Sequence, residues 1–147
     1  MSAAEDLVLF RRAPAGLRRG PLRDFAGELR EAVAGKRDFH CLITDDRELR
    51  RLNRRFRGAD RATDVLSFPS EAATGWLGEI AISSDRAARQ ARRFGHSRFD
   101  EIRILMLHGV LHLVGMDHET DGGRMARAEA RWRRRLDLPA GLIARTS

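Results

Sequence analysis

The stretch that decides the fold runs from Ser97 to His118 and reads SRFDEIRILMLHGVLHLVGMDH. It predicts a helix from Ser97 to about Val114, opened by Ser97 with Asp100 three residues later as a helix-capping pair. This helix is apolar almost all round, and a helix without a polar face belongs in the interior of a protein. We therefore expect it to be the central element of the fold.

Shorter elements are expected on both sides of this helix. Short apolar runs bounded by turn residues predict strands at residues 7–10, 39–43, 65–68 and 77–82. Helical spacing predicts further helices at residues 21–34, 45–57, 83–94 and 121–136. The strands and helices do not alternate as in a regular βαβ repeat. We therefore expect an α+β fold, with a small mixed four-stranded sheet and about five helices.

The charge of the chain indicates a class of partner. It contains 28 basic and 21 acidic residues, with a net charge of +7, and Lys36 is its only lysine. The planar guanidinium group of arginine matches phosphate geometry, so a small arginine-rich basic protein suits nucleic acid. A GC-rich genome also favours arginine codons, so composition alone leaves this interpretation open.

Composition also excludes several classes of protein. A single cysteine, Cys41, excludes an internal disulfide framework and a cysteine-rich zinc site, and we expect it to be a small buried side chain. No apolar run approaches the roughly 18 residues that span a bilayer. Glu5 and Asp6 precede the first apolar stretch, unlike a signal peptide. We expect a cytoplasmic protein of one domain that has no membrane partner.

Three of the five histidines lie close together, at His108, His112 and His118. His108 and His112 are four residues apart, so their rings leave the same face of the central helix. Gly115 is expected to end the helix in a left-handed conformation, which lets the chain turn back and bring His118 to the pair. Unsatisfied imidazoles on so apolar a helix would be costly. We predict a catalytic metal site with a fourth position for water, and zinc as the metal.

The same spacing occurs in the metzincin proteases, which read H-E-x-x-H-x-x-G-x-x-H. Gly109 stands where those enzymes place their general-base glutamate. The sequence therefore keeps the metal site and lacks the base, which favours a hydrolase other than a peptidase.

A second motif lies between Leu52 and Pro69 and reads LNRRFRGADRATDVLSFP. Its arginines at positions 54, 55, 57 and 61 surround a helix end and a loop, where they are suited to phosphate oxygens. A solvated helix face is the alternative interpretation. Trp76 and Trp132 are expected to be packing anchors, although an exposed Trp76 is also able to stack on an RNA base.

Together the two motifs resemble the YbeY family of bacterial rRNA maturation factors. The similarity covers about residues 40 to 130 and includes Gly78-Glu79-Ile80 and Gly95-His96, with Phe56, Glu79 and Met116 as departures. It implies that residues 1–147 form a single metal-dependent hydrolase domain, a single-strand-specific endoribonuclease. The expected roles are maturation of the 3′ end of small-subunit rRNA and ribosome quality control. The implied partners are the rRNA precursor and the ribosome or its proteins.

The resemblance also assigns site residues. His108, His112 and His118 match the metal ligands of the family, and Arg57 matches its active-site arginine, which we expect to neutralise charge on the scissile phosphate. The general base is open, with Asp117 as one candidate and the ribose 2′-hydroxyl as an alternative nucleophile. A zinc metalloprotease-like hydrolase and a non-catalytic rRNA-binding assembly factor with a structural metal remain alternative functions.

Overall fold

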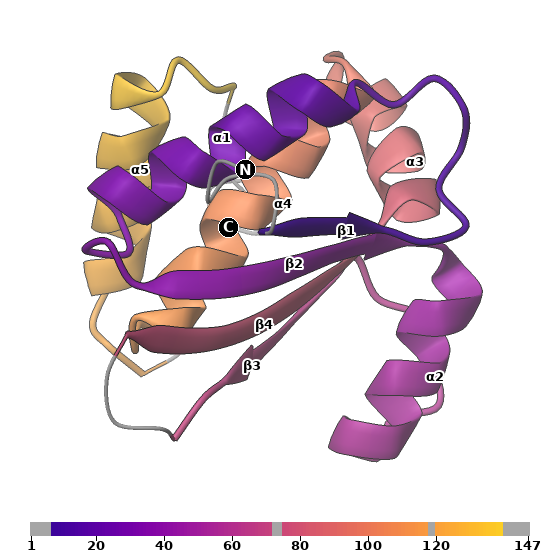
Figure 1. Cartoon of the computed structure of the whole chain (residues 1–147), viewed down its shortest axis with the longest axis horizontal. Helices are drawn as coiled ribbons and strands as arrows, with labels where there is room; N and C mark the ends of the chain where they lie inside the picture. Colours follow the sequence, from indigo (N-terminus) through magenta and orange to yellow (C-terminus); the bar gives the residue numbers. More distant parts are fainter. Residues whose placement is uncertain (1–6, 72–74, 118–119, 140–147) are drawn as a thin grey trace.

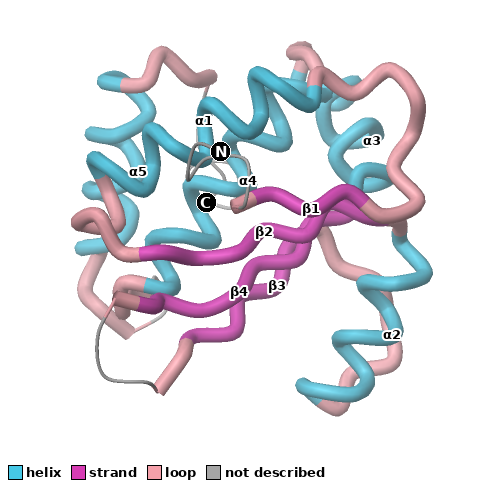
Figure 2. Tube along the Cα trace, in the orientation of Figure 1, coloured by secondary structure: helices cyan, strands magenta, loops and turns pink. Residues whose placement is uncertain are grey.

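The computed structural model describes residues 7–71, 75–117 and 120–139, in which the elements follow one another in the predicted order (Figures 1 and 2). The strands are β1 (Val8–Phe10), β2 (Asp38–Thr44), β3 (Val65–Pro69) and β4 (Trp76–Ser83). The helices are α1 (Arg19–Ala32), α2 (Asp46–Arg57), α3 (Ser84–Phe94), α4 (Arg98–Leu113) and α5 (Arg124–Arg135). The predicted α+β class is confirmed, and each predicted strand agrees with the observed one to within one residue at either end.

The four strands form one mixed sheet in the order β1-β2-β4-β3. β2 runs parallel to both β1 and β4, whereas β3 pairs antiparallel with β4 and forms an edge of the sheet. Helix α1 makes the crossover between the parallel neighbours β1 and β2, as a parallel pair requires. Gly78 adopts φ +136°, and a Cβ atom there would lie 2.2 Å from the Phe68 carbonyl oxygen, so only glycine fits this point of the β3–β4 pair.

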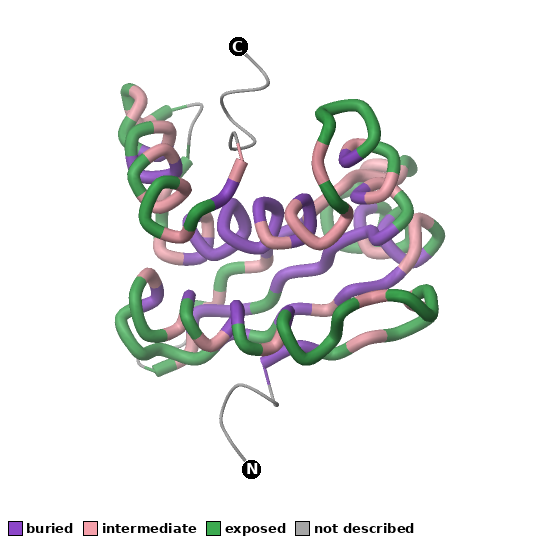
Figure 3. Tube along the Cα trace, turned by 90° about the horizontal axis from the view of Figure 1, so that it is seen from above, coloured by how far each residue is buried: buried purple, intermediate pink, exposed green. Residues whose placement is uncertain are grey.

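The main core lies between one face of the sheet and α4, with α1, α3 and α5 packed around that helix (Figure 1). Alternate strand residues face this core, among them Cys41, Ile80 and Ile82. In Figure 3 the buried residues follow the strands and the central helix, and the outer faces of the flanking helices are exposed. The prediction that the 97–114 helix is buried in the centre is confirmed.

The opposite face of the sheet is covered only in part. Helix α2 stands apart from the other helices in Figure 1 and packs Leu49 against Leu66 and Ala81. Leu9, on the same side of the sheet as Leu42, is 56% exposed. One face of the sheet is therefore a core and the other is partly open.

Two helices begin two or more residues away from the predicted start. Helix α5 begins at Arg124 and not at Asp121, because Gly122 and Gly123 have φ of +66° and +88°, which no right-handed helix accepts. Helix α1 begins at Arg19, two residues before Pro21, because proline is tolerated in a first turn where no N–H bond is required. None of the helices in the described ranges has the length and hydropathy that a membrane span requires.

Candidate active site

The two helical histidines lie side by side at the C-terminal end of α4. Their Nε2 atoms are 3.2 Å apart, and their rings meet edge to face with centroids 4.8 Å apart. His108 is buried, with 5% of its surface exposed, whereas His112 is half-buried. The i, i+4 spacing therefore brings both Nε2 atoms to one point, as the sequence predicts.

A buried glutamate from α5 orients the first of these rings. Glu129 is 2% exposed, and its Oε2 atom lies 3.0 Å from His108 Nδ1. A carboxylate accepts hydrogen bonds when it is ionised, so this contact favours the tautomer of His108 that carries its proton on Nδ1 and its lone pair on Nε2. This carboxylate–histidine arrangement is typical of metal-binding imidazoles. Sequence reasoning missed Glu129, although its place on the inner face of α5 beside Met125 and Ala128 was a signal.

The geometry of the pair fits a metal ligand set. Two imidazole nitrogens on one tetrahedral zinc ion lie about 3.3 Å apart, given Zn–N bonds of about 2.0–2.1 Å. The observed Nε2–Nε2 separation of 3.2 Å is close to that value. The predicted third ligand, His118, lies outside the described residues. Within residues 7–71, 75–117 and 120–139, no three His, Cys, Asp or Glu side chains form a metal-binding group.

Arg57 reaches the same site from the last turn of α2. Its Nη2 atom donates a hydrogen bond of 2.5 Å to the Ser67 carbonyl oxygen on β3. The Ser67 hydroxyl in turn donates to the Gly109 carbonyl oxygen on α4, at 3.2 Å. Ser67 thus joins the arginine to the turn of α4 that carries His108.

Local sequence explains why α2 ends here. Gly58 follows Arg57 as a left-handed cap with φ +69°, and its N–H bonds back to the Arg54 carbonyl oxygen. The buried Asn53 side chain donates to the Arg61 carbonyl oxygen at 3.0 Å and fixes the loop that leads into β3. Cap and loop together hold Arg57 at the edge of the site.

These residues border one open pocket of about 460 Å³. Its walls come from the end of α2, strand β3 and the C-terminal part of α4: Arg57, Val65, Leu66, Ser67, Pro69, His108, His112, Gly115, Met116 and Asp117. Asp117, the candidate base, is among these lining residues. We call this cavity the histidine pocket. The structure therefore gathers two predicted metal ligands, the predicted arginine and the candidate base.

Gly109 faces away from this pocket. A Cβ atom at Gly109 would lie 2.9 Å from Ile80 Cγ2 on β4, so glycine permits the close approach of α4 to the sheet. In a metzincin, the general-base glutamate occupies this position of the motif. Here a glutamate would be directed into the core, which removes the basis for a peptidase.

The other histidines and the cysteine lie elsewhere. His96 pairs through Nε2 with the fully buried Glu101 at 2.6 Å, near the opposite end of α4. His40 lies on the partly open face of the sheet. Cys41 is buried as expected, and burial raises the pKa of its thiol to about 12, so it is no nucleophile at neutral pH.

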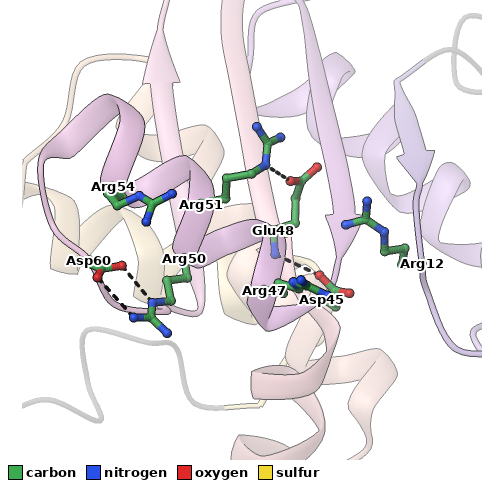
Figure 4. Close-up of a pocket in the computed structure, with 8 residues that line it drawn as sticks. All are labelled: Arg12, Asp45, Arg47, Glu48, Arg50, Arg51, Arg54 and Asp60. Atoms are coloured by element: carbon green, nitrogen blue, oxygen red, sulfur yellow. Dashed lines mark hydrogen bonds and ion pairs between the residues drawn. The ribbon is translucent and has the colours of Figure 1, made fainter.

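A second charged hollow, of about 740 Å³, runs along α2 (Figure 4). We call it the arginine basin; its lining residues are Arg12, Asp45, Arg47, Glu48, Arg50, Arg51, Arg54 and Asp60. Figure 4 shows Arg50 paired with Asp60 and Arg51 paired with Glu48. Arg54, singled out in the sequence, lies here and not with Arg57.

Comparisons with known proteins identify the family of this chain. A family model described as "Endoribonuclease YbeY" matches residues 24–136. The chain is 61% identical to the Endoribonuclease YbeY of Solibacter usitatus over 138 residues, which is 94% of this chain and 92% of that protein. It is 47% identical to the Endoribonuclease YbeY of Koribacter versatilis over 141 residues, or 96% and 92% of the two chains.

A solved structure has the same fold. It is the solution structure of TM1509 from Thermotoga maritima, which is 30% identical in sequence with a TM-score of 0.55. The match covers 84% of this chain and 86% of that one. From the family model, the two relatives and this fold, it follows that the chain belongs to the YbeY endoribonuclease family.

Proposed function

We propose that this protein is a metal-dependent endoribonuclease that cleaves single-stranded RNA. The observation that carries the proposal is the pair of Nε2 atoms of His108 and His112, 3.2 Å apart, with Arg57 lining the same pocket. The name of the relatives, Endoribonuclease YbeY, and the net charge of +7 support RNA as the substrate.

We further propose the precursor of small-subunit rRNA as the substrate, with processing of its 3′ end and ribosome quality control as the roles. The family resemblance of the two motifs supports this choice. The histidine pocket adjoins no second RNA-binding domain in the described part of the chain, so the ribosome or its proteins are the expected source of specificity.

Zinc is the proposed metal, held by His108, His112 and His118. When bound at imidazoles, a zinc ion lowers the pKa of a coordinated water toward 7 and polarises a phosphoryl oxygen. Glu129 keeps the proton of His108 on Nδ1 and so presents the Nε2 lone pair to the site.

Arg57 is suited to the scissile phosphate. One of its N–H groups is used at the Ser67 carbonyl oxygen, and the rest of its five donors remain available to non-bridging oxygens. This charge-assisted contact strengthens as negative charge grows on the phosphate in the transition state. Asp117 is the carboxylate among the described lining residues and is the candidate for accepting the proton of the nucleophile.

The test is cleavage of a single-stranded rRNA fragment that carries a 3′ extension, by wild type and His112→Ala purified side by side. His112 is the half-buried histidine of the pair, so its removal is expected to leave the fold intact, as circular dichroism and thermal unfolding will check. We expect cleavage by wild type alone and a reduced metal content in the variant. Equal cleavage by both proteins would contradict the proposal.

The same preparation separates two alternatives. If chelation unfolds the protein and no RNA is cut on intact ribosomal particles, the metal is structural and the protein is an assembly factor. The product ends identify the nucleophile. A 2′,3′-cyclic phosphate identifies the ribose 2′-hydroxyl as the nucleophile, and a 5′-phosphate opposite a free 3′-hydroxyl identifies water.

A further inference from the structure

The partly open face of the sheet carries a row of rings around one carboxylate. Glu79 of β4 is in register with Phe68 on β3 and with His40 on β2, so the three side chains lie in line across adjacent strands. Glu79 and His40 are exposed and Phe68 is half-buried. The carboxylate of Glu79 takes part in no ion pair with another described residue.

Further rings extend this row at both ends. Phe56 of α2 is 57% exposed and meets the Phe68 ring edge to face, with centroids 5.5 Å apart. At the other end Trp76 contacts His40 with centroids 4.6 Å apart. A largely apolar cavity of about 530 Å³ lies over this face, bordered by Phe56, Phe68, Glu79 and His40 among others. Its volume is within the range of small-molecule sites, about 300–1,000 Å³.

Arg57 connects this face to the histidine pocket. Its guanidinium carbon lies 5.7 Å from the centroid of the Phe68 ring, while its Nη2 atom binds the Ser67 carbonyl oxygen beside the pocket. Ser67 and Phe68 are consecutive residues of β3, and their side chains point to opposite faces of the sheet. The edge strand β3 therefore borders both cavities, with Phe68 lining one and Ser67 lining the other.

We propose that the row Phe56–Phe68–Glu79–His40 is a nucleobase subsite, which binds a base of the RNA strand near the scissile phosphate. The inference rests on the proposed function, since the phosphate is assigned to Arg57. Single-stranded RNA is bound by stacking unpaired bases on aromatic rings. An exposed Phe56 beside the partly covered Phe68 supplies such a surface.

Glu79 gives the subsite a preference for cytosine or adenine over uracil. An ionised carboxylate only accepts hydrogen bonds, so it favours a base edge with an exocyclic amino group, such as N4 of cytosine or N6 of adenine. Uracil presents a carbonyl oxygen where cytosine has that amino group, and two acceptors repel. We therefore assign Glu79 as the residue that disfavours uridine in this subsite.

The first experiment measures binding apart from cleavage. Fluorescence anisotropy of short labelled oligo(C) and oligo(U) is recorded with His112→Ala as the background, alone and combined with Phe56→Leu. Leucine keeps the apolar contact and removes the stacking ring, so we expect roughly fivefold weaker binding or more. Phe94→Leu is the matched control, because Phe94 is also an exposed phenylalanine near the end of a helix, with Arg93 over its ring at 5.4 Å. It should leave the affinity unchanged.

The second experiment tests the base preference. Cytosine and uracil stack similarly and differ at position 4, so we expect the His112→Ala background to bind oligo(C) about fivefold more tightly than oligo(U). Glu79→Gln carries both a donor and an acceptor, and it should abolish most of that ratio. The same ratio is measured for cleavage in proteins that retain His112.

The outcomes separate this inference from the proposed function. The subsite is supported, even if no RNA is cut, when two results hold together. Phe56→Leu must lower the affinity for RNA, and Glu79→Gln must abolish the preference for oligo(C) over oligo(U). Cleavage with an unchanged ratio in Glu79→Gln, or equal affinities of Phe56→Leu and Phe94→Leu, overturns the subsite and leaves the nuclease. If sedimentation shows a concentration-dependent dimer that Phe56→Leu dissociates, the face is an interface with a second copy of the chain. That result also overturns the subsite.

Discussion

The arginine basin and the histidine pocket both take arginines from α2, and they differ in what those arginines contact. In the basin Arg50 pairs with Asp60 at 2.8 Å and Arg51 pairs with Glu48 at 2.6 Å. Arg57, in the last turn of the same helix, binds a backbone carbonyl oxygen and enters no ion pair with the described residues. The basin is the larger hollow and holds more arginines, yet much of its charge is neutralised internally.

The comparison shows that a count of arginines does not locate a phosphate site. A guanidinium already held by a carboxylate has its charge partly neutralised by that pair, whereas one held by a neutral carbonyl keeps its full charge for the ligand. By this criterion Arg57 is available for catalysis and Arg50 and Arg51 are largely occupied. The histidines and Glu129 lie on the Arg57 side only.

The difference between the two hollows is tested most directly by removing one arginine from each and measuring RNA cleavage. We expect Arg57→Ala to lower kcat/KM for RNA cleavage by about 10²–10³-fold, the usual cost of losing one transition-state donor. Arg50→Ala, in the basin and on the same helix, should change it less than about threefold, because Arg50 is already paired with Asp60. Steady-state cleavage of one labelled substrate at fixed salt measures both. Equal losses would mean that RNA follows the whole length of α2.

The next largest effect is expected at the histidine–glutamate pair. Glu129→Gln keeps the shape of the side chain but weakens the acceptor at His108 Nδ1, so metal affinity should fall by about 10–100-fold. Competition with a chelating dye measures that affinity, and excess metal should restore cleavage. Glu101→Gln is the matched control, because Glu101 is a buried partner of a histidine, His96, outside the histidine pocket. If both variants lose metal equally, Glu129 does not orient a ligand.

The sequence predicts the parts of this site that local spacing determines. His108 and His112 share a helix, so their i, i+4 spacing is enough to place their rings together. The predicted cap at Ser97, whose side chain accepts from the Asp100 N–H at 3.0 Å, is likewise a local signal and is observed. Gly115 adopts φ +98° after α4, as its place in the motif predicts.

Contacts between distant elements could not be predicted in this way. Glu129 lies 21 residues after His108, and no local pattern says that α5 packs its inner face on that part of α4. Alternation in the strands predicts two faces, but only the packing shows which face α4 covers and which stays partly open. The row from Phe56 to His40 brings together residues of four elements, α2, β3, β4 and β2, so no local pattern in the sequence indicates it.

The smallest expected effect concerns the stability of the fold. It tests whether the ion pairs inside the arginine basin stabilise the protein. Glu48 is 3% exposed, and the hydrogen bond from Arg51, together with that from Arg11, lowers the pKa of its carboxyl below the usual 4.5. A lowered folded-state pKa means that the charged form stabilises the fold. This contribution is complete above pH about 4.5 and is lost as the pH falls through the folded-state pKa.

Glu48→Gln should therefore lower the free energy of unfolding by about 1–3 kcal/mol at pH 7, leave cleavage unchanged, and make stability less dependent on pH below 4.5. Urea unfolding at pH 7, 5, 4 and 3 measures this. Asp60→Asn is the comparison within the basin: the hydrogen bond from Arg50 also lowers the pKa of Asp60, but Asp60 is exposed and salt screens the pair. If the free energy of unfolding of Glu48→Gln fell as steeply with acid as that of wild type, the ionised Glu48 carboxylate would not be a source of the stability of the fold.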